Sequence, residues 1–178
     1  MKRTFSTKRL CRAGVIAALY VATTYAFMPF AFGPLQVRPA EALCILPLFF
    51  PEAVPALYVG CMLSNLVSPF FFYDVLVGSL ATLLAALVTY MVGVFIKKDK
   101  NKLLLGGIAP VVLNALIIPL IIIFLYPSNG QTAATAALYF TYVLSIGLTQ
   151  LVWVYGLGSP LYYGVKSLQR HGVNFLRI

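Results

Sequence analysis

The chain has 178 residues, of which 61% are hydrophobic and only 10% are charged. Soluble domains carry roughly a quarter charged residues, so this composition excludes an ordinary soluble domain and predicts an integral membrane protein. Cys11, Cys44 and Cys61 show no metal-binding or paired spacing, and the chain has no phosphate loop of the Walker type. We therefore expect no metal, no disulfide framework, no cofactor in this chain and no ATP hydrolysis by that route.

Thirteen Lys and Arg residues stand against four acidic ones, and twelve of the thirteen fall into three clusters, within residues 2–12, 97–102 and 166–177. Basic residues beside apolar segments stay on the cytosolic side of a membrane. All three clusters and both termini are therefore predicted to be cytosolic, with an even number of crossings between successive clusters. A signal peptide over residues 1–32 is the alternative, against which the length of the apolar run counts.

Apolar segments separated by turn formers predict helices, in chain order, over residues 12–32, 39–50, 53–67, 74–96, 104–126 and 134–162. The longer segments have the roughly 20 residues needed to span the hydrocarbon core. Pro47, Pro51 and Pro55 interrupt the short second and third segments, which form either two spans or a re-entrant pair. We expect one all-α membrane domain over residues 1–178, a bundle of six transmembrane helices; four crossings with a re-entrant pair is the structural alternative.

Charged residues within the apolar region are candidates for function, because a charge at membrane depth is costly unless it is paired or hydrated. Arg38, Glu41 and Asp74 are predicted at the extracellular ends of helices, and Glu52 near a cytosolic turn. Arg38 and Glu41 are three residues apart, so they can pair with each other if Pro39 begins a helix. Alternatively, Glu41 or Asp74 can accept two hydrogen bonds from a planar donor edge or pair with a ligand ammonium.

Aromatic and amide side chains suggest a pocket for a planar, nitrogen-rich solute. The aromatic run before Asp74 forms either an interfacial belt or a stacking surface. The amides in the later helices make either interhelical hydrogen bonds or ligand contacts, and the two tyrosines pack in the core or line a cavity. The candidate substrate-binding residues are Arg38, Glu41, Asn65, Phe70, Phe72, Tyr73, Asp74, Asn114, Tyr139, Tyr142, Gln150 and Trp153.

Small residues recur every four positions in the first predicted helix, at Gly14, Ala18, Ala22 and Ala26. Such a stripe is a smooth face on which another helix can approach closely. The partner helix belongs either to the same bundle or to a separate membrane subunit.

Several of these motifs resemble a known family. They are Arg38-Pro-Ala-Glu41 followed by Leu46-Pro47; Gly60-Cys61 with Asn65; Asp74 followed by Gly78, Thr82 and Ala86; and the repeated alanines from Ala18 to Ala26. Over nearly its whole length the chain resembles the substrate-binding (S) components of energy-coupling factor (ECF) vitamin transporters, and within them the QueT family. Asn114 and the stretch from Gln150 to Pro160 match more loosely.

The resemblance implies a multi-pass protein of the bacterial plasma membrane that captures a queuosine precursor, a 7-deazaguanine such as its aminomethyl form, from outside. Glu41 and Asp74 would divide the base edge and the ammonium between them, and Arg38 would orient Glu41 or cap the loop. An aromatic side chain from the run 70–73, or Tyr139 or Tyr142, would stack on the base. The implied partners are a coupling membrane subunit, docked on the stripe of Gly14, Ala18, Ala22 and Ala26, and two cytosolic ATPases that use ATP. Nucleic acid is not an expected partner.

Three alternatives stay open at this point. The chain could be an S component for another vitamin, because the scaffold would be shared while the pocket differed. It could be a structural membrane subunit without a ligand. It could also be an intramembrane enzyme, but the sequence has no His/Ser/Asp set or metal cluster at membrane depth, so we do not expect an enzyme.

Overall fold

The computed structural model describes residues 7–32, 35–69, 71–125 and 136–171, and these residues are helical apart from short connections. The predicted all-α class is confirmed for this part of the chain. Its elements are α1 (Thr7–Ala26), α2 (Met28–Ala31), η1 (Pro39–Leu48), α3 (Ala53–Ser64), η2 (Asn65–Val67), α4 (Phe71–Tyr73), η3 (Asp74–Gly78), α5 (Ser79–Phe95), α6 (Asp99–Leu120), η4 (Ile121–Leu125), α7 (Ala136–Leu151), η5 (Val152–Leu157) and α8 (Gly158–Arg170). The elements η1 and η2 are 3₁₀ helices, whereas η3, η4 and η5 are π-helical stretches within longer helices.

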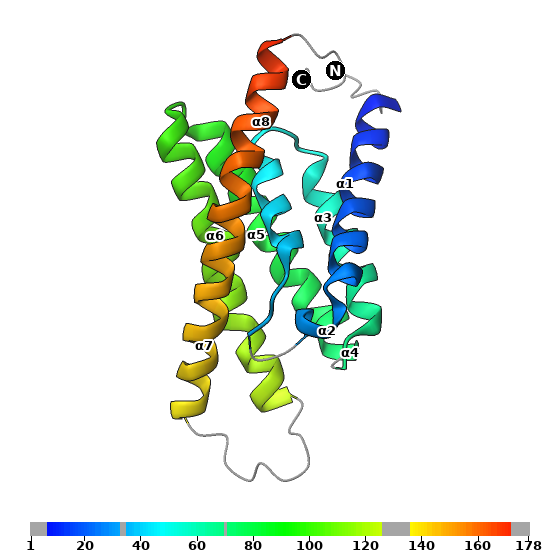
Figure 1. The fold of residues 1–178 in the computed structure, drawn as a ribbon, viewed down its shortest axis with the longest axis vertical. Helices are drawn as coiled ribbons and strands as arrows, with labels where there is room; N and C mark the ends of the chain where they lie inside the picture. The colour runs from blue at the N-terminus through cyan, green and yellow to red at the C-terminus, as the bar shows by residue number, and fades with distance from the viewer. Residues whose placement is uncertain (1–6, 33–34, 70, 126–135, 172–178) are drawn as a thin grey trace.

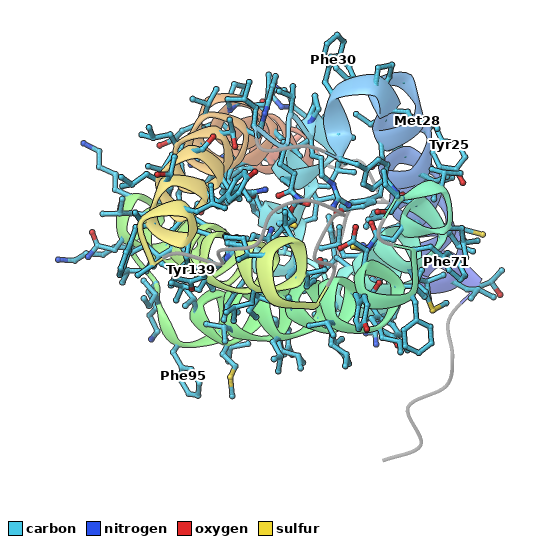
Figure 2. The ribbon with its side chains drawn as sticks, turned by 90° about the horizontal axis from the view of Figure 1, so that it is seen from below. Tyr25, Met28, Phe30, Phe71, Phe95 and Tyr139 are labelled. Carbon is cyan, nitrogen blue, oxygen red and sulfur yellow. The ribbon has the colours of Figure 1, made fainter. Side chains whose placement is uncertain are left out.

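Three helical stretches among the described residues are long and apolar enough to cross a membrane: Phe71–Phe95, Asp99–Ile123 and Ala136–Arg170. Each exceeds the roughly 20 residues that a span requires. Pro39–Leu48 and Ala53–Val67 are shorter apolar helices. Many large apolar side chains lie on the outside of the bundle. Phe30 and Phe95, for example, point away from it on opposite sides (Figure 2) and are 65% and 78% exposed. An outer surface of this kind suits contact with lipid.

Successive segments alternate in direction along the bundle (Figure 1). The start of α1, the connection between α5 and α6, and the end of α8 lie together at one end, and α2 and α4 lie at the other. We call the first the basic end, because residues 8–12, 97–102 and 166–170 bring all three basic clusters to it. There the Lys166 ammonium pairs with Asp99, whose other oxygen accepts a hydrogen bond from Tyr162 at 3.1 Å.

The short element η1 lies in the middle of the bundle, and all of its ten residues except Leu43 are buried. Pro39 occupies its first turn and Pro47 lies inside it. A proline inside an α-helix removes a hydrogen bond and clashes with the preceding turn, which favours the tighter and shorter 3₁₀ form here. A Cβ at Gly93 of α5 would lie 2.9 Å from the Leu48 Cα, so this glycine permits α5 to approach η1 closely.

Several helix bounds differ from those expected from the sequence. The first helix begins at Thr7 and ends at Ala26, because the chain turns before Pro29 and forms the separate short helix α2. The fifth predicted helix begins at Asp99, where an acidic residue in the first turn suits the helix dipole. The last helical stretch reaches Arg170. The predicted bounds at 126 and 134 lie outside the described residues.

Candidate functional site

A network of buried polar side chains centres on Glu41, which is 1% exposed and lies in the first turn of η1. Oε1 accepts a hydrogen bond from the Tyr20 hydroxyl at 2.8 Å and lies 3.6 Å from Nε of Arg38. Oε2 accepts from Nδ2 of Asn114 at 3.2 Å and from Sγ of Cys44 at 3.3 Å. Four donor groups from α1, η1 and its N-cap, and α6 therefore compensate this carboxylate for its loss of water.

Arg38 directly precedes η1 and is 3% exposed. Its Nη2 donates to the Tyr20 hydroxyl at 3.1 Å and to Oδ1 of Asn65 at 3.4 Å. The guanidinium carbon lies 5.7 Å from the ring centroid of Phe32 and 5.8 Å from that of Tyr20, within the range of cation–π attraction. Arg38 thus joins the Glu41 carboxylate to a second group of polar residues on η2 and η3.

That second group contains Asn65 and Asp74. Nδ2 of Asn65 donates to the backbone carbonyl of Asp74 at 2.8 Å, and the Ser68 hydroxyl donates to Oδ2 of Asp74. Asp74 is 5% exposed and begins η3, the π-helical stretch. Stretches of this kind occur often at functional sites, and here the carbonyl of Asp74 is available to a side chain from outside its own helix.

The acidic residues differ in their basic partners. Within the described residues the ion pairs are Arg12 with Glu52 at 2.6 Å, Arg38 with Glu41, and Lys166 with Asp99. Asp74 has no basic side chain at ion-pair distance among these residues. It is therefore the buried carboxylate whose charge is compensated least by the protein itself.

The structure brings together five of the residues expected from the sequence: Arg38, Glu41, Asn65, Asp74 and Asn114. They are buried within the bundle instead of lying on an exposed rim, because apolar elements surround the start of η1 on all sides. Other members of the network were not assigned to the site from the sequence, although Cys61 and Thr82 were named in the family motifs: Tyr20, Cys44, Cys61, Ser68 and Thr82. Tyr20 could have been found from its spacing with Arg12, Ile16 and Thr24, which marks the buried face of α1.

The remaining candidates lie elsewhere. Phe72 is 62% exposed and packs edge-on against Tyr73, so it lies outside the buried network. Tyr139 and Tyr142 are partly buried on α7, and the Tyr139 hydroxyl donates to the Leu116 carbonyl at 3.1 Å. Gln150 is fully buried, and Trp153 is partly buried one turn later. Phe70 lies outside the described residues.

The stripe of small residues faces outward. Gly14, Ala18, Ala22 and Ala26 are all exposed, and a Cβ at Gly14 would meet no atom within 4 Å. The opposite face of α1 packs against α3, where a Cβ at Gly60 would lie 3.0 Å from the Tyr20 Cβ. In the part of the chain that the structure describes, the stripe is therefore available to a separate molecule.

Together these features define an all-helical membrane protein with an apolar outer surface and a buried polar site in its interior. The sequence matches the family described as the QueT transporter over residues 10–167, and the chain belongs to this family. The family resemblance inferred from the motifs is thereby confirmed. Membership places the chain among transporters.

One characterised relative is similar over part of the chain. The queuosine precursor transporter QueT of Lactococcus lactis subsp. cremoris (strain MG1363) is 39% identical over 71 residues. This match covers 39% of the present chain and 41% of the relative, so it spans less than half of either protein. No solved structure matches the chain.

Proposed function

We propose that the chain is the substrate-capture component of an ECF-type ABC importer and takes up a queuosine precursor, a 7-deazaguanine such as its aminomethyl form. It would cross the cell membrane six times, with a coupling membrane subunit and two cytosolic ATPases as partners that supply the work of ATP hydrolysis. Family membership and the similarity to the queuosine precursor transporter of Lactococcus lactis support the substrate class. The exposed stripe on α1 supports a docking face for the coupling subunit.

The arrangement of charges supports the proposed orientation. All three basic clusters lie at one end of the bundle (Figure 1), and basic residues flanking membrane spans favour the cytosolic side. The alternating directions of α1, η1, α3, α5, α6 and α7 are compatible with six crossings. Asp74 follows α4 at the opposite end, which would then face the exterior.

The observation that carries the substrate proposal is the contrast between the two buried carboxylates. Glu41 already has Arg38 as its basic partner, whereas Asp74 has none among the described residues. A ligand ammonium beside Asp74 would compensate the charge of that carboxylate, and charge-assisted hydrogen bonds are strong at a site removed from water. We therefore assign the aminomethyl group of the substrate to Asp74.

The base would then lie toward Glu41 and Asn114. Oε2 of Glu41 accepts from the Cys44 thiol at 3.3 Å and from the Asn114 amide at 3.2 Å. A thiol is a weak donor, so a ring or exocyclic N–H of a guanine-like base can replace it at the carboxylate with a gain in hydrogen-bond strength. Asn114 has a second amide proton and a carbonyl oxygen for the same base.

The test is a titration of the purified protein with 7-aminomethyl-7-deazaguanine, guanine, riboflavin and thiamine, followed by thermal unfolding. At equal concentrations the compound with the lowest Kd raises the unfolding temperature most, and we expect this to be the 7-deazaguanine. A ligand at 100 times its Kd stabilises the folded state by about 2.7 kcal/mol. A larger shift with riboflavin or thiamine would remove the substrate assignment and leave an S component for another vitamin. No shift with any compound would support a structural subunit.

A further inference from the structure

Gln150 on α7 is a buried amide without a hydrogen-bonding partner among the described residues. Its side chain is 0% exposed, and neither Oε1 nor Nε2 has a hydrogen bond. The other described residues with unpaired buried side-chain atoms, Arg12, Arg38 and Glu52, each have an ion-pair partner. Leaving a buried polar group unpaired costs free energy, and such a group in a native structure calls for a partner.

The position of Gln150 along the bundle can be fixed from its neighbours on α7. Ile146, one turn earlier, packs with Ile118 and Ile121, and a Cβ at Gly147 would lie 3.5 Å from the Ala115 Cβ. The helices α6 and α7 run in opposite directions (Figure 1). One turn onward on α7 therefore corresponds to one turn back on α6, which brings Gln150 to the level of Asn114.

Further along the same continuous helical stretch, at the start of α8, the chain adjoins η1. A Cβ at Gly158, two turns after Gln150, would lie 2.9 Å from Cγ1 of Ile45 and 3.4 Å from the Ala42 carbonyl. The intervening η5 is a π-helical stretch, and such stretches are frequent at functional sites. Gln150 thus lies at the level of Asn114 on a helical stretch that packs on α6 there and reaches Ala42 and Ile45 of η1 two turns later.

We propose that the Gln150 amide is a specificity-determining contact of this site and pairs with the lactam edge of the base, where a ring carbonyl stands beside a ring N–H. This inference rests on the proposed function. A carboxamide presents a donor and an acceptor side by side, which is complementary to a lactam. The contact selects a guanine-like base over an analogue in which an amino group replaces the ring carbonyl.

The test compares Gln150→Leu with the wild type in the full-length protein. The probes are 7-aminomethyl-7-deazaguanine and its 2,6-diamino analogue, which lacks the lactam. We expect Gln150→Leu to weaken binding of the lactam compound by about ten- to hundredfold, as for loss of a bidentate amide contact to a base, and to reduce discrimination between the two probes. Thr149→Val is the matched control, because its hydroxyl bonds only to carbonyls of its own helix in the described structure and its affinity should stay unchanged.

A second measurement separates recognition from a structural role. Because the amide has no hydrogen-bonding partner to lose within the described residues, Gln150→Leu should keep or raise the unfolding temperature of the ligand-free protein. Equal affinity of wild type and variant for the lactam compound would overturn the inference and leave the proposed function intact. A fall in ligand-free stability or a failure to fold would also overturn it. If the wild type bound no 7-deazaguanine, the proposed function itself would fail.

Discussion

The hydroxyl of Tyr20 lies between the two charges of a buried ion pair. It donates to Oε1 of Glu41 at 2.8 Å and accepts from Nη2 of Arg38 at 3.1 Å. Because Tyr20 belongs to α1 and Glu41 to η1, this one phenol ties the first helix to the central element. The direct approach of Arg38 to Glu41 is longer, at 3.6 Å, so the phenol completes the pair.

Tyr20→Phe should therefore destabilise the protein. The change removes the hydroxyl and leaves Glu41 and Arg38 each short of a partner in a buried site, which costs about 1–3 kcal/mol. Thermal unfolding of the detergent-solubilised protein measures the effect. Tyr163→Phe is the matched control, because Tyr163 is 50% exposed on α8 and lies outside the network. If both variants unfolded at the wild-type temperature, the phenol would not hold the ion pair together.

Part of this arrangement could be predicted from the sequence. The basic clusters lie together at one end because the chain runs along the bundle an even number of times between successive clusters (Figure 1), as their positions in the sequence predicted. The three-residue spacing of Arg38 and Glu41, on either side of Pro39, predicted that the two could pair, and they do so at the start of η1. These are local patterns, and one sequence is sufficient to recognise them.

The rest depends on packing between distant segments. Nothing near Cys61 indicates that Thr82 donates to its sulfur across 21 positions, since that contact exists only once α3 and α5 lie side by side. Consecutive aromatic residues point in different directions on a helix. The sequence therefore could not tell that Phe72 lies outside, whereas Tyr73 packs inward against the buried cluster of Ile118, Ile121 and Ile146. Gln150 was recognisable as a buried amide, but its unpaired state was not.

Asp74→Asn should weaken binding of the cationic substrate selectively. Loss of the negative charge removes a charge-assisted bond, so the affinity for 7-aminomethyl-7-deazaguanine should fall about ten- to hundredfold. The neutral 7-cyano analogue, which has no ammonium, should bind nearly as before. Titration of both compounds against wild type and variant measures the difference. Asp99→Asn is the control, because Asp99 pairs with Lys166 at the basic end. Unchanged affinity of Asp74→Asn for the aminomethyl compound would refute the assignment of the ammonium.

Larger residues on the exposed stripe of α1 should impair uptake without impairing capture. Ala18→Leu with Ala22→Leu would fill a face that a partner helix needs to approach closely. We expect the double variant to bind the substrate like the wild type in detergent, and to lose most substrate accumulation in cells that contain the coupling subunit and ATPases. Gly164→Leu is the control, since Gly164 is an exposed small residue with open space on α8. Normal uptake by the double variant would exclude this face as the docking surface.

Cysteine labelling in intact cells tests the orientation of the bundle. In a Cys11→Ser background the two remaining cysteines, Cys44 and Cys61, are buried. A cysteine in place of Phe72, which is 62% exposed and precedes Asp74 by two residues, should react with a membrane-impermeant maleimide added to intact cells. A cysteine in place of Lys97 at the basic end should react only after the cells are permeabilised, because basic segments stay in the cytosol.

The reverse labelling pattern would place the end of the molecule that carries Asp74 in the cytosol. Capture from outside would then be impossible through this end of the bundle, and the proposed uptake would have to be abandoned even if the protein bound a 7-deazaguanine. Labelling of both positions in intact cells, with the maleimide shown to stay outside by an unlabelled cytosolic protein, would instead contradict a membrane crossing by the helix Phe71–Phe95. The single span Phe71–Phe95 joins the two positions, so they must lie on opposite sides if that helix crosses the membrane.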